Sequence, residues 1–166
     1  MTTQAKLARA AVVLLLAGVL TSISCMHSAT INSTDAQTKA LLTINQTVAA
    51  ISTGNEAVAQ GVISVQAANL ISQAEAKAIL DWSRNVALAV EASEITLKAV
   101  TAKSIDWPTF VIQIQADLNR MSLPDSVKPY LAQTTATPPL VISLVRSIQT
   151  IVQSITVAVT TAQGAK

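Results

Sequence analysis

Residues able to do nucleophilic or acid–base chemistry are few in this sequence. His27 is the single histidine and Cys25 the single cysteine, and both lie before the first long stretch of helical periodicity. One histidine cannot supply the two Glu-x-x-His motifs of a di-metal helical bundle, nor a zinc site of cysteine and histidine. We therefore predict no catalytic residue, no metal site and no cofactor.

Carboxylate pairs are the remaining candidates for acid–base work. Glu91 and Glu94 are three residues apart, so a helix would place them on one face. Lys98 follows Glu94 at a spacing of four, which favours an ordinary surface ion pair, and Glu91 needs only solvent. The sequence also lacks nucleotide-binding glycine loops, the GxSxG elbow and a calcium-binding EF-hand loop. We accordingly expect a protein that is not an enzyme.

Composition and charge narrow the class of protein further. Just over half of the 166 residues are apolar, whereas aromatic residues make up 2% and charged residues 12%. The net charge of +2 comes from Lys6 and Arg9, because the nine other basic residues balance nine acidic ones. A neutral chain without a basic run lacks the electrostatic footprint of a nucleic-acid-binding protein.

The N-terminus has the layout of an export signal. Lys6 and Arg9 precede an uninterrupted run of apolar residues and glycine over 10–20, and Thr21-Ser22-Ile23-Ser24 follows before Cys25. The run is short for a membrane span, which takes about 20 residues, although a retained signal anchor is an alternative. We expect three segments: an export signal at 1–24, a tether at 25–33 and a helical bundle domain at 34–166.

The place of Cys25 directly after the apolar run resembles the lipidated cysteine of bacterial lipoproteins, whose signal is cut before the cysteine. The two residues before it suit that pattern, whereas Ser22 stands where leucine is usual. The resemblance implies a lipid anchor on Cys25 and a location in the cell envelope. The same small residues also fit ordinary signal cleavage and secretion. In a eukaryotic source, Asn32 and Asn45 would lie in glycosylation sequons.

The longest periodic stretch, 41–65, predicts a helix with buried neighbours. Its apolar residues recur at alternating intervals of three and four, the a/d pattern of a heptad repeat. A polar residue in such a seam typically fixes register and partner number, and Asn55 is the single one here. Alternatively, Asn55 lies beside a water or a bundle end and specifies nothing. The seam consists of Leu41, Ile44, Val48, Ile51, Asn55, Val58, Val62 and Val65.

A column of small residues, which includes Gly54 and Gly61, runs beside this seam at intervals of seven. Each glycine costs a helix about 1 kcal/mol relative to alanine. We therefore predict that a neighbouring backbone approaches closely at Gly54 and Gly61. The alternative is a helix broken near 52–55, but the heptad keeps its phase across that stretch.

Capping signals and periodicity predict three further helices. A capping box starting at Ser72 opens a helix that ends near 103, Asp106 caps a third helix, and Thr137 opens the last. An irregular crossover, with or without one short helical turn, is expected over 122–137.

The sequence therefore predicts an all-α protein: an antiparallel four-helix bundle of long, heptad-patterned helices behind an N-terminal signal segment. We expect a structural or protein-interaction role in the cell envelope, with the membrane reached through Cys25 and with a protein partner or self-association through the helices. A carrier whose seams open around a lipid or another apolar ligand is the alternative, and an enzyme ranks last. Trp82 and Trp107 are expected to cover the core; a pocket formed by both is the other possibility.

Overall fold

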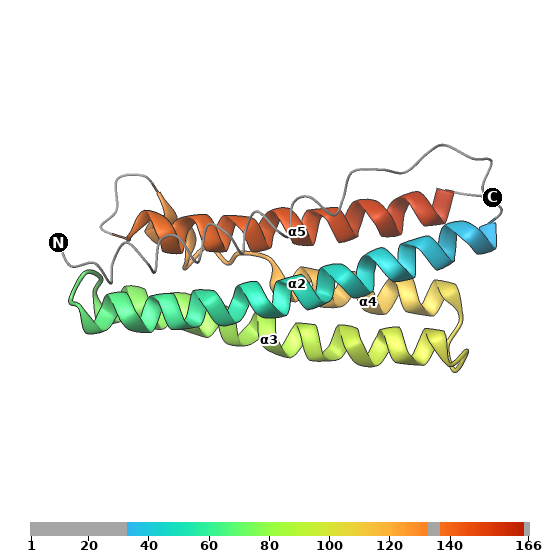
Figure 1. Cartoon of the computed structure of the whole chain (residues 1–166), viewed down its shortest axis with the longest axis horizontal. Coiled ribbons are helices and arrows are strands. Elements are labelled where there is room, and N and C mark those ends of the chain that lie inside the picture. The colour runs from blue at the N-terminus through green and yellow to red at the C-terminus, as the bar shows by residue number, and fades with distance from the viewer. Residues whose placement is uncertain (1–32, 133–136, 165–166) are drawn as a thin grey trace, which may run out of the picture. The chain divides into compact units, whose positions relative to one another are not determined.

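The computed structural model describes residues 33–132 and 137–164, which belong to one compact unit. Within these ranges the chain is all-helical, with four α-helices and no strand, as predicted (Figure 1). The predicted export signal, nearly all of the tether and Cys25 lie outside the described residues. The elements are α2 (Ser33–Ala67), α3 (Gln73–Thr101), α4 (Trp107–Met121), the short 3-10 helix η2 (Lys128–Leu131) and α5 (Pro139–Gly164).

The ends of α2 and α3 follow from local backbone chemistry. The capping box before α3 is confirmed, because the Glu75 amide donates to Ser72 Oγ (3.1 Å) and the Ser72 amide donates to Glu75 Oε2 (3.3 Å). Asn69 and Lys103 take left-handed conformations, with φ of 54° and 57°, just beyond the two helices. A residue in this conformation turns the chain out of the helix and lets later amides satisfy the last carbonyls.

The start of α4 and the crossover agree with the sequence, whereas α5 begins at Pro139, so Pro138 and not the predicted Thr137 directly precedes it. Asp106 caps α4 by accepting from the Thr109 amide at 2.9 Å, as predicted. α2 runs unbroken through 52–55, so the broken-helix alternative is wrong. The crossover before α5 contains η2, and two of its apolar side chains, Val127 and Leu131, are buried.

The core forms around the seam of α2. Its central members are 0–2% exposed: Ile44, Val48, Ile51, Val58 and Val62. α2 lies between α5 and α3 and packs extensively on both (Figure 1). α4, the shortest α-helix described, packs extensively on α3 and to a smaller extent on α5.

Length and composition alone would let α5 cross a membrane over Pro139–Gln163. The same properties are typical of a core helix, and α5 packs extensively on α2, although only 33% of the apolar window is buried. One face of α5 is fully buried, through Val141, Val145, Ile148, Ile155 and Val159.

Candidate functional site

Helix α3 carries most of the buried polar side chains in the described part of the chain. Because burying a polar group without a partner is unfavourable, buried polar residues are where specific contacts are expected. Three of the α3 residues bond to a residue outside α3 and its cap, each in a different part of the fold. The buried polar residues of α3 are Glu75, Ser83, Ser93 and Thr96, and those elsewhere are Asn55, Asp117 and Thr137.

The first contact joins α2 to α3. Asn55 Nδ2 donates to the Ser83 carbonyl, and Ser83 Oγ donates to Asn55 Oδ1, both at 2.9 Å. The buried amide of Asn55 therefore has a partner at each end, and both partners belong to one residue of the same chain. The register that this pair can fix is that of α2 against α3. The predicted effect of Asn55 on partner number stays a prediction.

The glycine column of α2 faces α5. A Cβ atom added to Gly54 would lie 3.5 Å from Ile148 Cγ1, and one added to Gly61 would lie 3.9 Å from Val141 Cγ2. These are ordinary van der Waals distances to side chains, so the predicted close approach of a backbone is wrong at these positions. The branched side chains of α5 border each glycine and leave room for a methyl group beside it.

The second contact joins the beginning of α3 to the approach to α5. The Glu75 carboxylate accepts from the amide and the hydroxyl of Ser72, each at 3.3 Å, and from the hydroxyl of Thr137. Both Glu75 and Thr137 are buried. The sequence predicts the local role of each as a helix-end residue, but it does not predict that the two meet, since 62 residues separate them.

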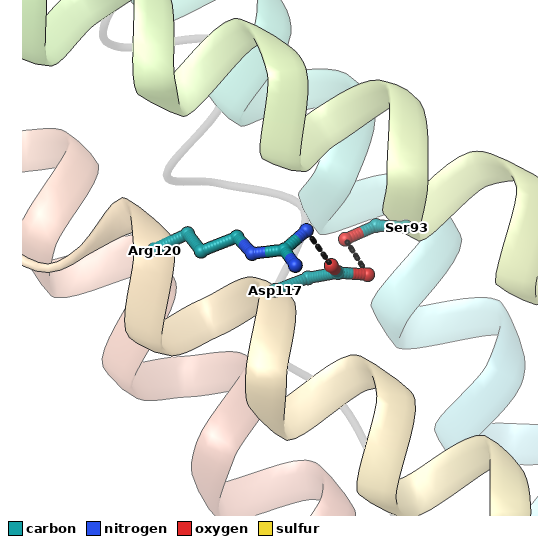
Figure 2. A network of polar contacts seen from close by, with 3 residues as sticks. All are labelled: Ser93, Asp117 and Arg120. Carbon is teal, nitrogen blue, oxygen red and sulfur yellow. Dashed lines mark hydrogen bonds and ion pairs between the residues drawn. The ribbon is translucent and has the colours of Figure 1, made fainter.

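The third contact is a buried carboxylate between α3 and α4. Figure 2 shows the carboxylate of Asp117 between the hydroxyl of Ser93 and the guanidinium of Arg120. Ser93 Oγ lies 3.5 Å from Asp117 Oδ2, and Arg120 Nη1 lies 3.4 Å from Asp117 Oδ1. Burial raises the pKa of Asp117, and it outweighs the opposing effects of Arg120 and Ser93. A carboxylate usually becomes buried only with strong partners, and these two contacts are long.

Sequence reasoning missed Asp117. Ile114 and Met121 lie on the buried apolar face of α4, and Asp117 lies three residues after the first and four before the second. A charged residue at that spacing occupies the buried stripe of a helix, which was the available signal.

The two tryptophans lie in different surroundings. Trp82 is 1% exposed, and its Nε1 donates to the Met121 carbonyl at 3.2 Å, so it belongs to the core interior rather than to an edge. The Met121 carbonyl also accepts from Gln149 Nε2 at 3.1 Å. Trp107 packs on Phe110 with ring centroids 5.0 Å apart, and its buried Nε1 has no partner within the described residues.

A groove of about 450 Å³ lies between α2 and α3. Glu94 and Lys98 both line it and, although both are described, they do not form the ion pair that their spacing predicts. Glu91 is exposed. The groove combines apolar and polar lining residues, among them Leu41, Val48, Leu97, Asn45, Glu94 and Lys98.

No group of three His, Cys, Asp or Glu side chains within the described ranges is arranged to hold a metal ion. Comparison of the chain with protein-family models, curated proteins and solved structures finds no match. The function must therefore be argued from the residues themselves.

Proposed function

We propose that the chain is an exported helical-bundle protein, anchored to a membrane through a lipid on Cys25, with a structural or protein-interaction role in the cell envelope and without catalytic activity. The observation that carries the proposal is the closure of the α2 seam inside the chain. Its central apolar residues are 0–2% exposed, and Asn55 finds both of its partners on Ser83. Because the seam is closed inside the chain, a protein partner would have to contact the outer surface of the bundle.

An antiparallel arrangement of the helices is part of the proposal. Three pairings support it for α2 and α3, because position rises along one helix as it falls along the other. Leu41 and Ala102 line the same groove, Asn55 bonds to Ser83, and Gln66 and Gln73 line a second hollow.

With Cys25 replaced by serine, spin labels at Asn45 and Thr101 should be close. Labels at Asn45 and Gln73 should be farther apart by roughly 30 Å, from a rise of about 1.5 Å per residue. Equal distances would contradict the arrangement.

Exposed apolar side chains support the interaction role. Leu88 and Ile95 on α3 are 56% and 67% exposed, and Ile112 on the adjacent α4 is 68% exposed. Large apolar groups at the surface can contact a protein partner or a second copy of the chain, although single exposed apolar residues are common.

Fractionation and intact mass test the anchor. We expect Cys25→Ser to move the protein from the membrane fraction to the soluble fraction. His27→Ser, the matched control beside it, should stay in the membrane fraction. A single acyl chain binds membranes only marginally, so the mature form is expected to carry at least two. A native mass equal to that of the unmodified chain beginning at Cys25 would rule out the lipid.

The groove between α2 and α3 favours a carrier as the second candidate, because its volume of about 450 Å³ would admit a small ligand. Native mass spectrometry of the purified protein should then show a copurified apolar molecule. Ala49→Trp, which fills the groove, should remove that molecule, whereas Ala116→Trp on the exposed face of α4 should not. A wild-type protein that purifies without a ligand would contradict the carrier role and favour the structural role.

A further inference from the structure

We propose that Asp117, together with Ser93 and Arg120, is a pH-sensitive latch between α3 and α4 that holds α4 more firmly when its carboxyl group is protonated. The proposal concerns the stability of one helix interface and is independent of the proposed anchor. It begins from the position of Asp117, which is 5% exposed in the middle of the buried stripe of α4.

Helix α4 is held in the bundle mainly by its packing on α3. α4 packs extensively on α3, less on α5, and has no comparably extensive contact with α2. A charge placed within the α3–α4 interface therefore acts directly on whether α4 stays docked.

The charge of ionised Asp117 is weakly compensated. Its two polar contacts are 3.4 Å and 3.5 Å long, near the outer limit for hydrogen bonds. The side chain of Arg120 is 66% exposed, so water screens its attraction for the carboxylate. On α3, the charged side chains on either side of Ser93 are Glu91 and Glu94, and both are exposed. Glu94 and Lys98 line the groove toward α2. Arg120 is the charged group that acts on Asp117 electrostatically.

The hydroxyl of Ser93 can serve both protonation states of Asp117. A serine hydroxyl donates to a carboxylate and equally accepts from a carboxylic acid. The protonated form therefore keeps its hydrogen bond while losing the buried charge, and burial raises the pKa of Asp117 accordingly. Between the ordinary and the raised pKa, the equilibrium constant for opening of α4 should rise by up to about tenfold for each pH unit.

Hydrogen exchange of the α4 amides, corrected for intrinsic rates, tests the latch over an acidic-to-neutral pH series. In the wild-type protein, protection of α4 should fall as pH rises through the pKa of Asp117, measured from its carboxyl carbon by NMR. Asp117→Asn should show no such fall. Asp125→Asn is the matched control: Asp125 is exposed and pairs with Lys128 at 2.7 Å, so the fall in α4 protection should persist.

A second variant keeps the test informative if Asp117→Asn fails to fold. Arg120→Gln removes the attraction that favours the ionised form, so it should raise the pKa of Asp117 further and shift the loss of protection to higher pH by the same amount. A purely structural role for Arg120 would leave that pKa in place. The proposal is overturned by an Asp117 pKa at or below the ordinary value, or by wild-type α4 protection that does not change with pH.

Discussion

Helix α3 contacts α2 and α4 through one buried polar pair each, and the two pairs differ in how well their hydrogen bonds satisfy the buried groups. On the side of α2, Ser83 forms two hydrogen bonds of 2.9 Å with the neutral amide of Asn55. On the side of α4, Ser93 forms a long hydrogen bond of 3.5 Å with the carboxylate of Asp117. Both pairs are buried and both use a serine of α3, so the difference lies in the partner.

The difference indicates what each interface gains from its polar pair. Two short, reciprocal bonds satisfy the Asn55 amide, so losing either partner leaves a buried group without its bond. Asp117 keeps a desolvation penalty that its contacts do not cancel, so removing its charge should raise the free energy of unfolding. We therefore expect substitutions at the two sites to change the free energy of unfolding in opposite directions.

The largest effect should come from Asn55→Val, which leaves the buried Ser83 hydroxyl without its acceptor. We expect the free energy of unfolding to fall by about 1–3 kcal/mol, measured by urea denaturation. The double variant with Ser83→Ala should recover much of this loss, because no polar side chain is then orphaned. Sedimentation equilibrium on the same variants tests the predicted effect of Asn55 on partner number. A single variant as stable as wild type would contradict the comparison.

A smaller change of opposite sign is expected for Asp117→Asn. Since the pKa of Asp117 is raised in the fold, its contribution to stability is fully present below the ordinary pKa and is lost as pH rises through the raised value. The variant should therefore melt above wild type at pH 7, and the difference should vanish in acid. A lower melting temperature at pH 7 would show that the contacts to Ser93 and Arg120 outweigh burial.

The smallest effect concerns the other side of α2, where α5 packs on the glycine column. Gly61→Ala should raise the free energy of unfolding by roughly 0.4–1 kcal/mol, because the new methyl group meets only side chains, the nearest at 3.9 Å. Gly54→Ala should gain less, since Ile148 lies at 3.5 Å. Destabilisation by both, in thermal melts, would mean that the glycines are needed for packing after all.

The sequence predicts the elements of this fold well because their signals are local. The Ser72 capping box, the Asp106 cap and the seam around Ile51 each depend on spacings within a few turns of one helix. The seam also predicts burial, and the structure confirms it for the central residues.

The candidate site could be predicted only in part, because its contacts join distant residues. Asn55 is conspicuous as the polar member of a seam, but nothing in its neighbourhood names Ser83 as its partner. The spacing of Asp117 from Ile114 and Met121 indicates that it is buried, but it does not identify Ser93 on α3 as its partner. The small-residue column predicts a close neighbour, but it does not distinguish a neighbouring backbone from the side chains that the structure shows there.

The order in which these contacts close along the chain has a consequence for folding. The pairs Asn55–Ser83 and Ser93–Asp117 span 28 and 24 residues, whereas Glu75–Thr137 spans 62. Loop closure over the longer span is less favourable by roughly 0.7 kcal/mol. We therefore expect α5 to dock last, although α2 packs on it extensively. Until α5 has docked, the glycine face of α2 is uncovered, and a chain truncated before Pro139 would expose that face permanently.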